Sequence, residues 1–186
     1  MQDAIWRLTR EVLSRAAAIK EPSVDNYLTQ LTSLTPEQSA AASLMRADTT
    51  VPNYRGLGVA LLDVAITTPS AATHSDAIYT TAGVAANRVA AYKQGKYAKT
   101  HVTKDDYRRR LLLPFILEIW GYVHDDARAV LEDTALCLAR QAVVGTAEPS
   151  RESVAAHTAR VFAIISIALQ RGVTSMVTAE IGRAHV

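Results

Sequence analysis

Two aspartates in β-prone segments are the residues of this sequence most suited to chemistry. Asp48 opens the segment 48–53, and Asp63 lies within the almost wholly apolar segment 59–68. Because a tight turn separates the two segments, we expect the carboxylates to converge at one end of a sheet. Converging carboxylates form a hard-oxygen site that suits Mg²⁺ or Mn²⁺. An aspartate at a strand start is more often a turn residue, but a charge inside a buried strand needs a partner.

Two lysines provide a candidate cation for the same site. Lys93 and Lys96 lie in a helix predicted for residues 81–99. The helical period places both lysines on or beside the side of the helix that carries Ala82, Ala85, Val89 and Tyr92. We therefore expect at least one ammonium to point towards Asp63, where it would stabilise a phosphate oxyanion or orient water. Metal-activated water beside a cation is the usual means of cleaving a phosphodiester.

The elements that must position these residues follow from hydrophobic patterning and turn signals. The segments 48–53 and 59–68 are predicted to form a hairpin, and segment 111–121 a third strand that is buried apart from Glu118. Further elements are predicted as helices at 1–19, 36–45, 125–144 (capped by Asp125 or Asp126) and 150–170, and a short edge strand within 23–35. This order predicts one α/β domain over residues 1–180, in which helices flank a central mixed sheet of about four strands.

Composition excludes several classes of protein. The 186 residues are 49% hydrophobic and 20% charged, as in one globular domain. The single Cys137 excludes a disulfide framework or a multi-cysteine zinc site in this chain. The longest apolar run, Val161 to Leu169, is shorter than the roughly 18–20 residues of a membrane span, so no membrane association is predicted. Residues 181–186 read as a translated sequencing adapter and are set apart from the domain.

The net charge of +2 does not by itself indicate a nucleic-acid partner, but the cations are concentrated in one stretch. The stretch from 88 to 110 interleaves tyrosines with the basic residues Arg88, Lys93, Lys96, Lys99, Lys104, Arg108, Arg109 and Arg110. Such a patch suits contacts with a phosphate backbone. A solvated helix end and loop would explain the stretch equally well.

Several short strings resemble a known family in combination. They are Arg46-Ala47-Asp48, Val51-Pro52-Asn53, residues 62–69 (LDVAITTP), 93–97 (KQGKY) and 114–121 (PFILEIWG). The chain resembles the restriction-enzyme-like endonuclease domain of non-LTR retrotransposon polyproteins, a member of the PD-(D/E)xK nuclease superfamily. The resemblance extends from the first helix to about Gln170 and implies a restriction-endonuclease-like fold with C-terminal helices.

The resemblance also implies roles for individual residues. Asp48 matches the first metal-binding aspartate of the family, and Asp63 matches the second. The superfamily lysine normally stands two residues after the second acid, where this chain has Ala65; the family instead places it on the following helix in a K-x-x-K-Y pattern. The residues that match this pattern are Lys93, Lys96 and Tyr97. Glu118 matches a recurrent glutamate of the last core strand, with a structural or auxiliary role.

The function that the resemblance implies is Mg²⁺- or Mn²⁺-dependent nicking of DNA, which leaves a 3′-hydroxyl for an attached or associated reverse transcriptase. The expected location is intracellular, and nuclear if the element is eukaryotic. Two alternatives remain open at this stage. One is a degenerate nuclease fold that binds nucleic acid without cutting it. The other is a non-enzymatic α/β scaffold in which Asp63 and Glu118 are buried partners of Lys93, Lys96 or Arg88.

Overall fold

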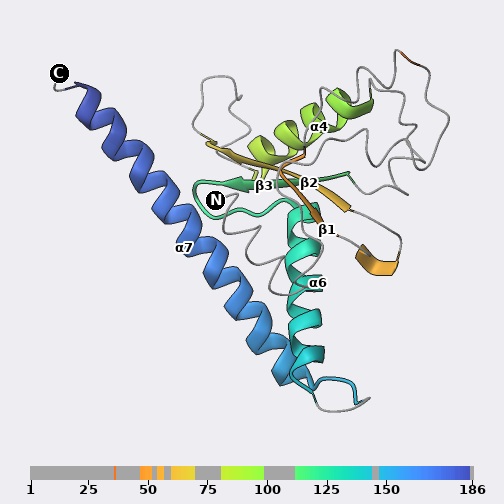
Figure 1. Ribbon diagram of the computed structural model, residues 1–186. Helices are drawn as coiled ribbons and strands as arrows, with labels where there is room; N and C mark the ends of the chain where they lie inside the picture. The colour runs from red at the N-terminus through yellow and green to blue at the C-terminus, as the bar shows by residue number, and fades with distance from the viewer. Residues whose placement is uncertain are drawn as a thin grey trace.

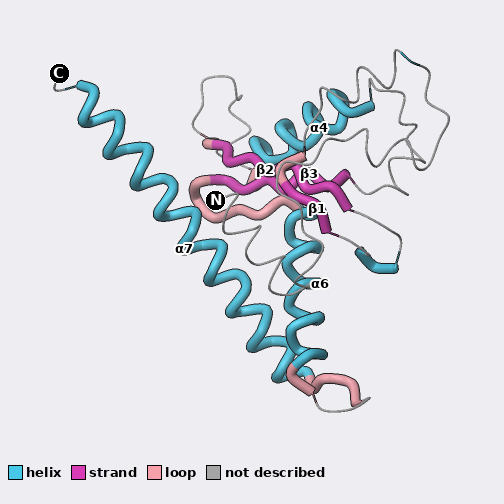
Figure 2. Tube along the Cα trace, viewed as in Figure 1, coloured by secondary structure: helices cyan, strands magenta, loops and turns pink. Residues whose placement is uncertain are grey.

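A three-stranded mixed sheet forms the centre of the molecule (Figures 1 and 2). The computed structural model describes residues 36, 47–51, 54–56, 60–69, 81–98, 112–143 and 147–184. The strands are β1 (Thr49–Val51), β2 (Ala60–Thr67) and β3 (Leu112–Glu118), arranged in the order β1-β2-β3. The pair β1–β2 is antiparallel and the pair β2–β3 is parallel. The predicted α/β class with a mixed sheet is therefore confirmed.

The predicted hairpin is confirmed by the pairing of β1 with β2. Thr49 lies opposite Leu62 in this register. The connection contains the 3₁₀ turn η1 (Tyr54–Gly56), in which Arg55 has a left-handed backbone with φ of 51°. A bulky residue rarely adopts this conformation unless side-chain contacts hold it there, and Arg55 has such a contact with Asp133.

Helices cover both faces of the sheet, which explains why β2 is apolar on both sides. The helix α4 (Val84–Ala98) packs on one face through Ala86 and Ala90, which contact Ile116 of β3. The opposite face is the larger core, where α6 (Asp125–Gln141) lies below the sheet in Figure 1 and the first half of α7 (Arg151–Ala184) runs beside α6. This core includes Leu62, Phe115, Leu117, Val130, Leu131, Val161 and Ile165. Burial of each large apolar side chain stabilises the fold by about 1.5–3 kcal/mol.

The two C-terminal helices differ from their predicted boundaries. His124, rather than Asp125 or Asp126, is the N-cap of α6, because its imidazole Nδ1 accepts a hydrogen bond from the Asp126 N–H at 3.3 Å. The aspartates instead occupy the first turn, where carboxylates favour the positive end of the helix dipole. The helix α7 does not end near Gln170 but continues to Ala184, so it includes residues 181–184 of the segment set apart as a tail.

The mean hydropathy of α7 gives a different indication about a membrane span from the length of its longest unbroken apolar run. The stretch Arg151–Ser175 of α7 is long and apolar enough to cross a membrane, by length and composition only. Core helices of soluble proteins meet the same criterion. The absence of an unbroken apolar run therefore does not by itself exclude a span. In Figure 1 the C-terminal half of α7 extends away from α6.

The remaining fold predictions are either corrected by the structure or concern residues outside the described part of the chain. The described part of the chain contains three strands of the sheet instead of about four, and β1 is shorter than the predicted 48–53. The predicted helices 1–19 and 36–45 and the edge strand within 23–35 lie outside the described residues, apart from Pro36, which is helical. The restriction-endonuclease-like arrangement of the whole domain stays a prediction.

Candidate functional site

The register of the hairpin brings Asp48 and Asp63 together. Asp48 lies one residue before the Thr49–Leu62 pair, and its N–H donates to the Leu62 carbonyl at 2.8 Å. This places Asp48 opposite Asp63, and side chains that oppose each other in an antiparallel pair have Cβ atoms about 4.5–5.5 Å apart on the same face. The Asp63 carboxyl group is close enough to raise the pKa of Asp48. The predicted convergence of these acids is therefore present.

The environment of Asp48 disfavours its charged form. Burial is the largest cause that raises the pKa of Asp48, and the neighbouring Asp63 charge raises it further. A hydrogen bond from the Val64 N–H to Asp48 Oδ2, at 2.6 Å, opposes this shift, as does the Lys93 ammonium. The pKa of Asp48 remains above its ordinary value, so this carboxyl group retains its proton to a higher pH than an isolated aspartate does.

Lys93 supplies the cation of this cluster. Its Nζ forms an ion pair with Asp63 Oδ1 and lies 3.4 Å from the Val64 carbonyl oxygen. The side chains of Lys93 and Asp63 are only 16% and 11% exposed. The lysine reaches the sheet because it follows Ala86 and Ala90 along one stripe of α4, and these small residues let the helix approach closely. The predicted contact between a helix ammonium and Asp63 is therefore present.

The predicted packing face of α4 is partly wrong. Tyr92, expected on the packed side, is 74% exposed, whereas Tyr97 is buried. Lys96 is exposed and does not join the acids; its ammonium lies over the Tyr97 ring, 5.7 Å from the centroid. Of the residues predicted to pack, Ala85 is buried and Val89 packs beside the Ala86–Ala90 stripe, whereas Ala82 and Tyr92 are exposed. The Lys96 ammonium therefore lies with Tyr97 and not beside Asp63.

Of the basic stretch, the structure places only the helical part. Arg88 lies on an exposed position of α4. The other proposed nucleic-acid contacts lie outside the described residues: Lys99, Lys104, Arg108, Arg109 and Arg110.

Glu118 lies at the far end of the same sheet face and caps α4. Its Oε1 accepts a hydrogen bond from the Ala86 N–H at 3.0 Å, and the residue is 4% exposed. Ala86 is in the first turn of α4, where backbone N–H groups have no partner within the helix. The glutamate thus fixes α4 on the sheet and orients the helix that carries Lys93. Its predicted structural or auxiliary role is consistent with this contact.

A second polar cluster was not anticipated from the sequence. Arg55 Nε donates to Asp133 Oδ2 of α6 at 2.6 Å, and the Arg55 guanidinium lies 5.3 Å from the centroid of the Tyr54 ring. Tyr54 is also hydrogen-bonded to Asp133, and burial followed by this contact raises the pKa of the phenol. The partners are distant in sequence, and neither residue type nor spacing marks them. This cluster attaches the hairpin turn to α6.

The oxygens around Lys93 fit a hard divalent cation. Asp48 and Asp63 offer carboxylates, and the Val64 carbonyl faces the same ammonium. Mg²⁺ and Mn²⁺ prefer such oxygen ligands and complete their shell with water. Among the described residues, no group of three or more histidine, cysteine or acidic side chains converges, so this set holds two carboxylates at most.

Comparisons with protein-family models, curated proteins and solved structures found no match to this chain.

Proposed function

We propose that this chain is a metal-dependent nuclease domain that hydrolyses phosphodiester bonds in DNA. The observation that carries the proposal is the pair of facing carboxylates, Asp48 and Asp63, with the Lys93 ammonium against one of them. Two acids that face each other on a covered side of a sheet repel each other when both are charged, and a bound cation relieves that repulsion. A site of this kind suits a divalent cation and the phosphate that it would bind.

Each residue of the cluster has a distinct expected role. Asp48 and Asp63 would hold Mg²⁺ or Mn²⁺, which supplies activation of water and neutralises developing negative charge when bound. Only the deprotonated carboxylate of Asp48 can bind a cation. Because the pKa of Asp48 is raised, this form appears at a higher pH than it does for an isolated aspartate. Lys93 keeps its ammonium beside Asp63, where it is positioned to donate a hydrogen bond to a non-bridging phosphate oxygen. Val64 N–H fixes the orientation of the Asp48 carboxylate.

DNA as the substrate, and an attached or associated reverse transcriptase as a partner, are parts of the same proposal and rest on the family resemblance. A nick that leaves a 3′-hydroxyl would provide a primer end for such an enzyme. An intracellular location, nuclear for a eukaryotic element, follows from that partner.

A second candidate function is supported by one observation. The Lys93–Asp63 ion pair is largely buried, as expected for a structural contact in a non-enzymatic scaffold. The same geometry is also compatible with a nuclease fold that binds nucleic acid without cleavage. Cleavage activity distinguishes these alternatives from the nuclease.

A plasmid-nicking assay with Mg²⁺ or Mn²⁺ tests the proposal. We expect the parent chain to convert supercoiled DNA to the open circle only with metal, and D63N to be at least about 100-fold slower, because the variant removes a charged ligand. K96M is the matched control, since Lys96 is on the same helix but away from the acids. Equal metal-dependent nicking by the parent and D63N would contradict the proposal, as would a folded parent that never nicks.

A further inference from the structure

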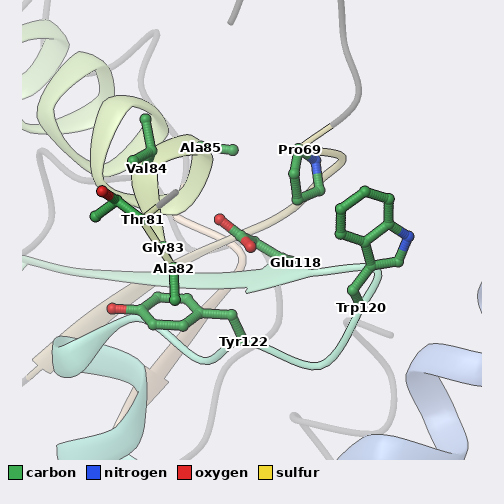
Figure 3. Close-up of a pocket in the computed structure, with 9 residues that line it drawn as sticks. All are labelled: Pro69, Thr81, Ala82, Gly83, Val84, Ala85, Glu118, Trp120 and Tyr122. Atoms are coloured by element: carbon green, nitrogen blue, oxygen red, sulfur yellow. The ribbon is translucent and has the colours of Figure 1, made fainter. Parts of the chain in front are cut away.

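A small pocket lies between the start of α4 and the end of β3 (Figure 3). Its volume is about 210 Å³, below the roughly 300–1,000 Å³ of sites for drug-sized ligands. The pocket therefore suits one planar group of a larger molecule. The residues that define its chemistry are Pro69, Gly83, Val84, Glu118, Trp120 and Tyr122.

Two aromatic rings shape this pocket in different ways. Tyr122 packs against the backbone of Gly83, where an added Cβ would lie 2.2 Å from the ring, so glycine is required at that position. Trp120 is in the turn that follows β3 and is 65% exposed, which is unusual for the largest apolar side chain. Figure 3 shows its indole beside Pro69, across the pocket from the first residues of α4. An exposed indole at the mouth of a pocket is available for stacking.

Glu118 gives the pocket its polar group. One carboxylate oxygen accepts from the Ala86 N–H, and the carboxylate lines the pocket among mainly apolar neighbours. The positive end of the α4 dipole faces this carboxylate, so the dipole would repel a cationic ligand group at the same place. A neutral planar group with an N–H donor meets no such repulsion. Nucleobases have this character, and an exocyclic amine such as cytosine N4 donates well to a glutamate.

We infer that this pocket binds an unstacked nucleobase of single-stranded DNA, which stacks on Trp120 and donates its exocyclic amine to Glu118. This inference rests on the proposed function, because it supposes that the chain binds DNA. Aromatic side chains commonly hold single strands by stacking, which every base permits, while the carboxylate adds a preference for a base with an amino group. The pocket is thus a base-recognition subsite.

The position of the pocket agrees with this role. Glu118 pairs in register with Thr67, four residues beyond Asp63 on β2, and both acids face α4. At about 3.3 Å per residue, the two sites are about 13 Å apart along the strand. Because Ala86 and Ala90 of α4 pack on Ile116 between the two sites, a strand held by a base in the pocket would pass around α4 to reach the aspartates.

Binding of fluorescent homopolymeric oligonucleotides in EDTA tests the inference without any cleavage. We expect oligodeoxycytidylate to bind about threefold or more tightly than oligothymidylate, and W120A to lose about fivefold or more in affinity for both. Y92A is the matched control, since Tyr92 is an equally exposed aromatic residue on the outer side of α4. Unchanged affinity in W120A, or an equal loss in Y92A, would overturn the inference.

A second variant tests the carboxylate. E118Q keeps an oxygen for the Ala86 N–H and places an amide donor in the pocket, so we expect the preference for cytosine over thymine to vanish or reverse. An unchanged preference would overturn the assignment to Glu118. Binding of an arginine-rich peptide that depends on Trp120, with no binding of either oligonucleotide, would show a peptide site instead. Metal-dependent nicking is measured separately, so a parent chain that nicks DNA but shows no base preference would refute this subsite and not the nuclease.

Discussion

Two polar clusters lie on opposite sides of the same hairpin, and they differ in their balance of charge. On the α4 side, Asp48 and Asp63 face each other and share the single Lys93 ammonium. On the α6 side, Asp133 is the one acid, and it accepts hydrogen bonds from both Arg55 and Tyr54. Among the described residues, the first cluster places two acids beside one lysine, whereas the second places one acid beside two hydrogen-bond donors.

This difference separates a structural contact from a candidate binding site. The Asp133 cluster is complete without a ligand and attaches the hairpin turn to α6. The Asp48–Asp63 cluster is less favourable as it stands, because burial and like charge both raise the pKa of Asp48. A divalent cation would relieve the repulsion between the acids. Variants of the two clusters are therefore expected to respond differently to metal.

The largest effect on stability is expected for K93M. This change leaves Asp63 beside Asp48 with no ammonium, and removal of one partner of a buried ion pair costs about 3 kcal/mol or more. We expect a lower free energy of unfolding in urea with EDTA, and a partial recovery with Mn²⁺. K96M is the control and should change stability by less than about 0.5 kcal/mol. Equal effects of the two variants would contradict the role of Lys93.

A smaller loss is expected for D133A in the balanced cluster. The variant removes a partly exposed ion pair, worth up to about 1 kcal/mol, and deprives the buried Tyr54 hydroxyl of an acceptor, which costs about 1 kcal/mol more. Thermal and urea unfolding should show this loss equally with and without Mn²⁺. A loss that Mn²⁺ repaired would mean that the two clusters do not differ as described.

A change in the opposite direction is expected for D48N. The asparagine oxygen can still accept from the Val64 N–H, and its amide can donate to Asp63 without a second charge. We expect stability in EDTA to rise by up to about 1 kcal/mol, the contribution of one hydrogen bond. Lower stability of D48N at neutral pH, with unchanged structure, would contradict repulsion between the acids.

The smallest expected effect is a difference between the parent and D48N in how the free energy of unfolding depends on pH. Folded Asp48 has a pKa above its ordinary value of 3.8, so the folded chain binds more protons than the unfolded chain between the two values. The contribution of protonated Asp48 to the free energy of unfolding is therefore fully present below pH 3.8 and is lost as the pH rises through the raised pKa. Urea titrations in EDTA across this window should show the loss in the parent but not in D48N. Parallel curves for both chains would refute the assigned shift.

Local sequence patterns predicted the acids of the site and its lysine. The tight hairpin brought Asp48 opposite Asp63, and the helical period indicated that Lys93 could reach the sheet. Both inferences depend on short-range geometry that the chain encodes directly. The predicted face of α4 was right for Ala85 and Val89 but wrong for Tyr92, because alanines occur all around the helix and apolarity alone did not identify the packed stripe.

The contacts that the sequence did not predict depend on tertiary packing. The Arg55–Asp133 pair joins residues 78 positions apart, and its turn has a backbone conformation that arginine does not favour by itself. The cap that Glu118 provides to α4 likewise needs the parallel crossover to bring β3 under the helix start. No local period or motif specifies either contact.

Titration of the metal-free chain with Mn²⁺ by isothermal calorimetry is the most direct test of the central claim, that Asp48 and Asp63 form a divalent-cation site. The account predicts one binding event in the parent, tighter as the pH rises above the raised pKa of Asp48, and its loss in both D48N and D63N, while D133A binds as the parent does. Absence of Mn²⁺ binding by the folded parent, or binding by D48N and D63N that is as tight as that of the parent, would contradict the account.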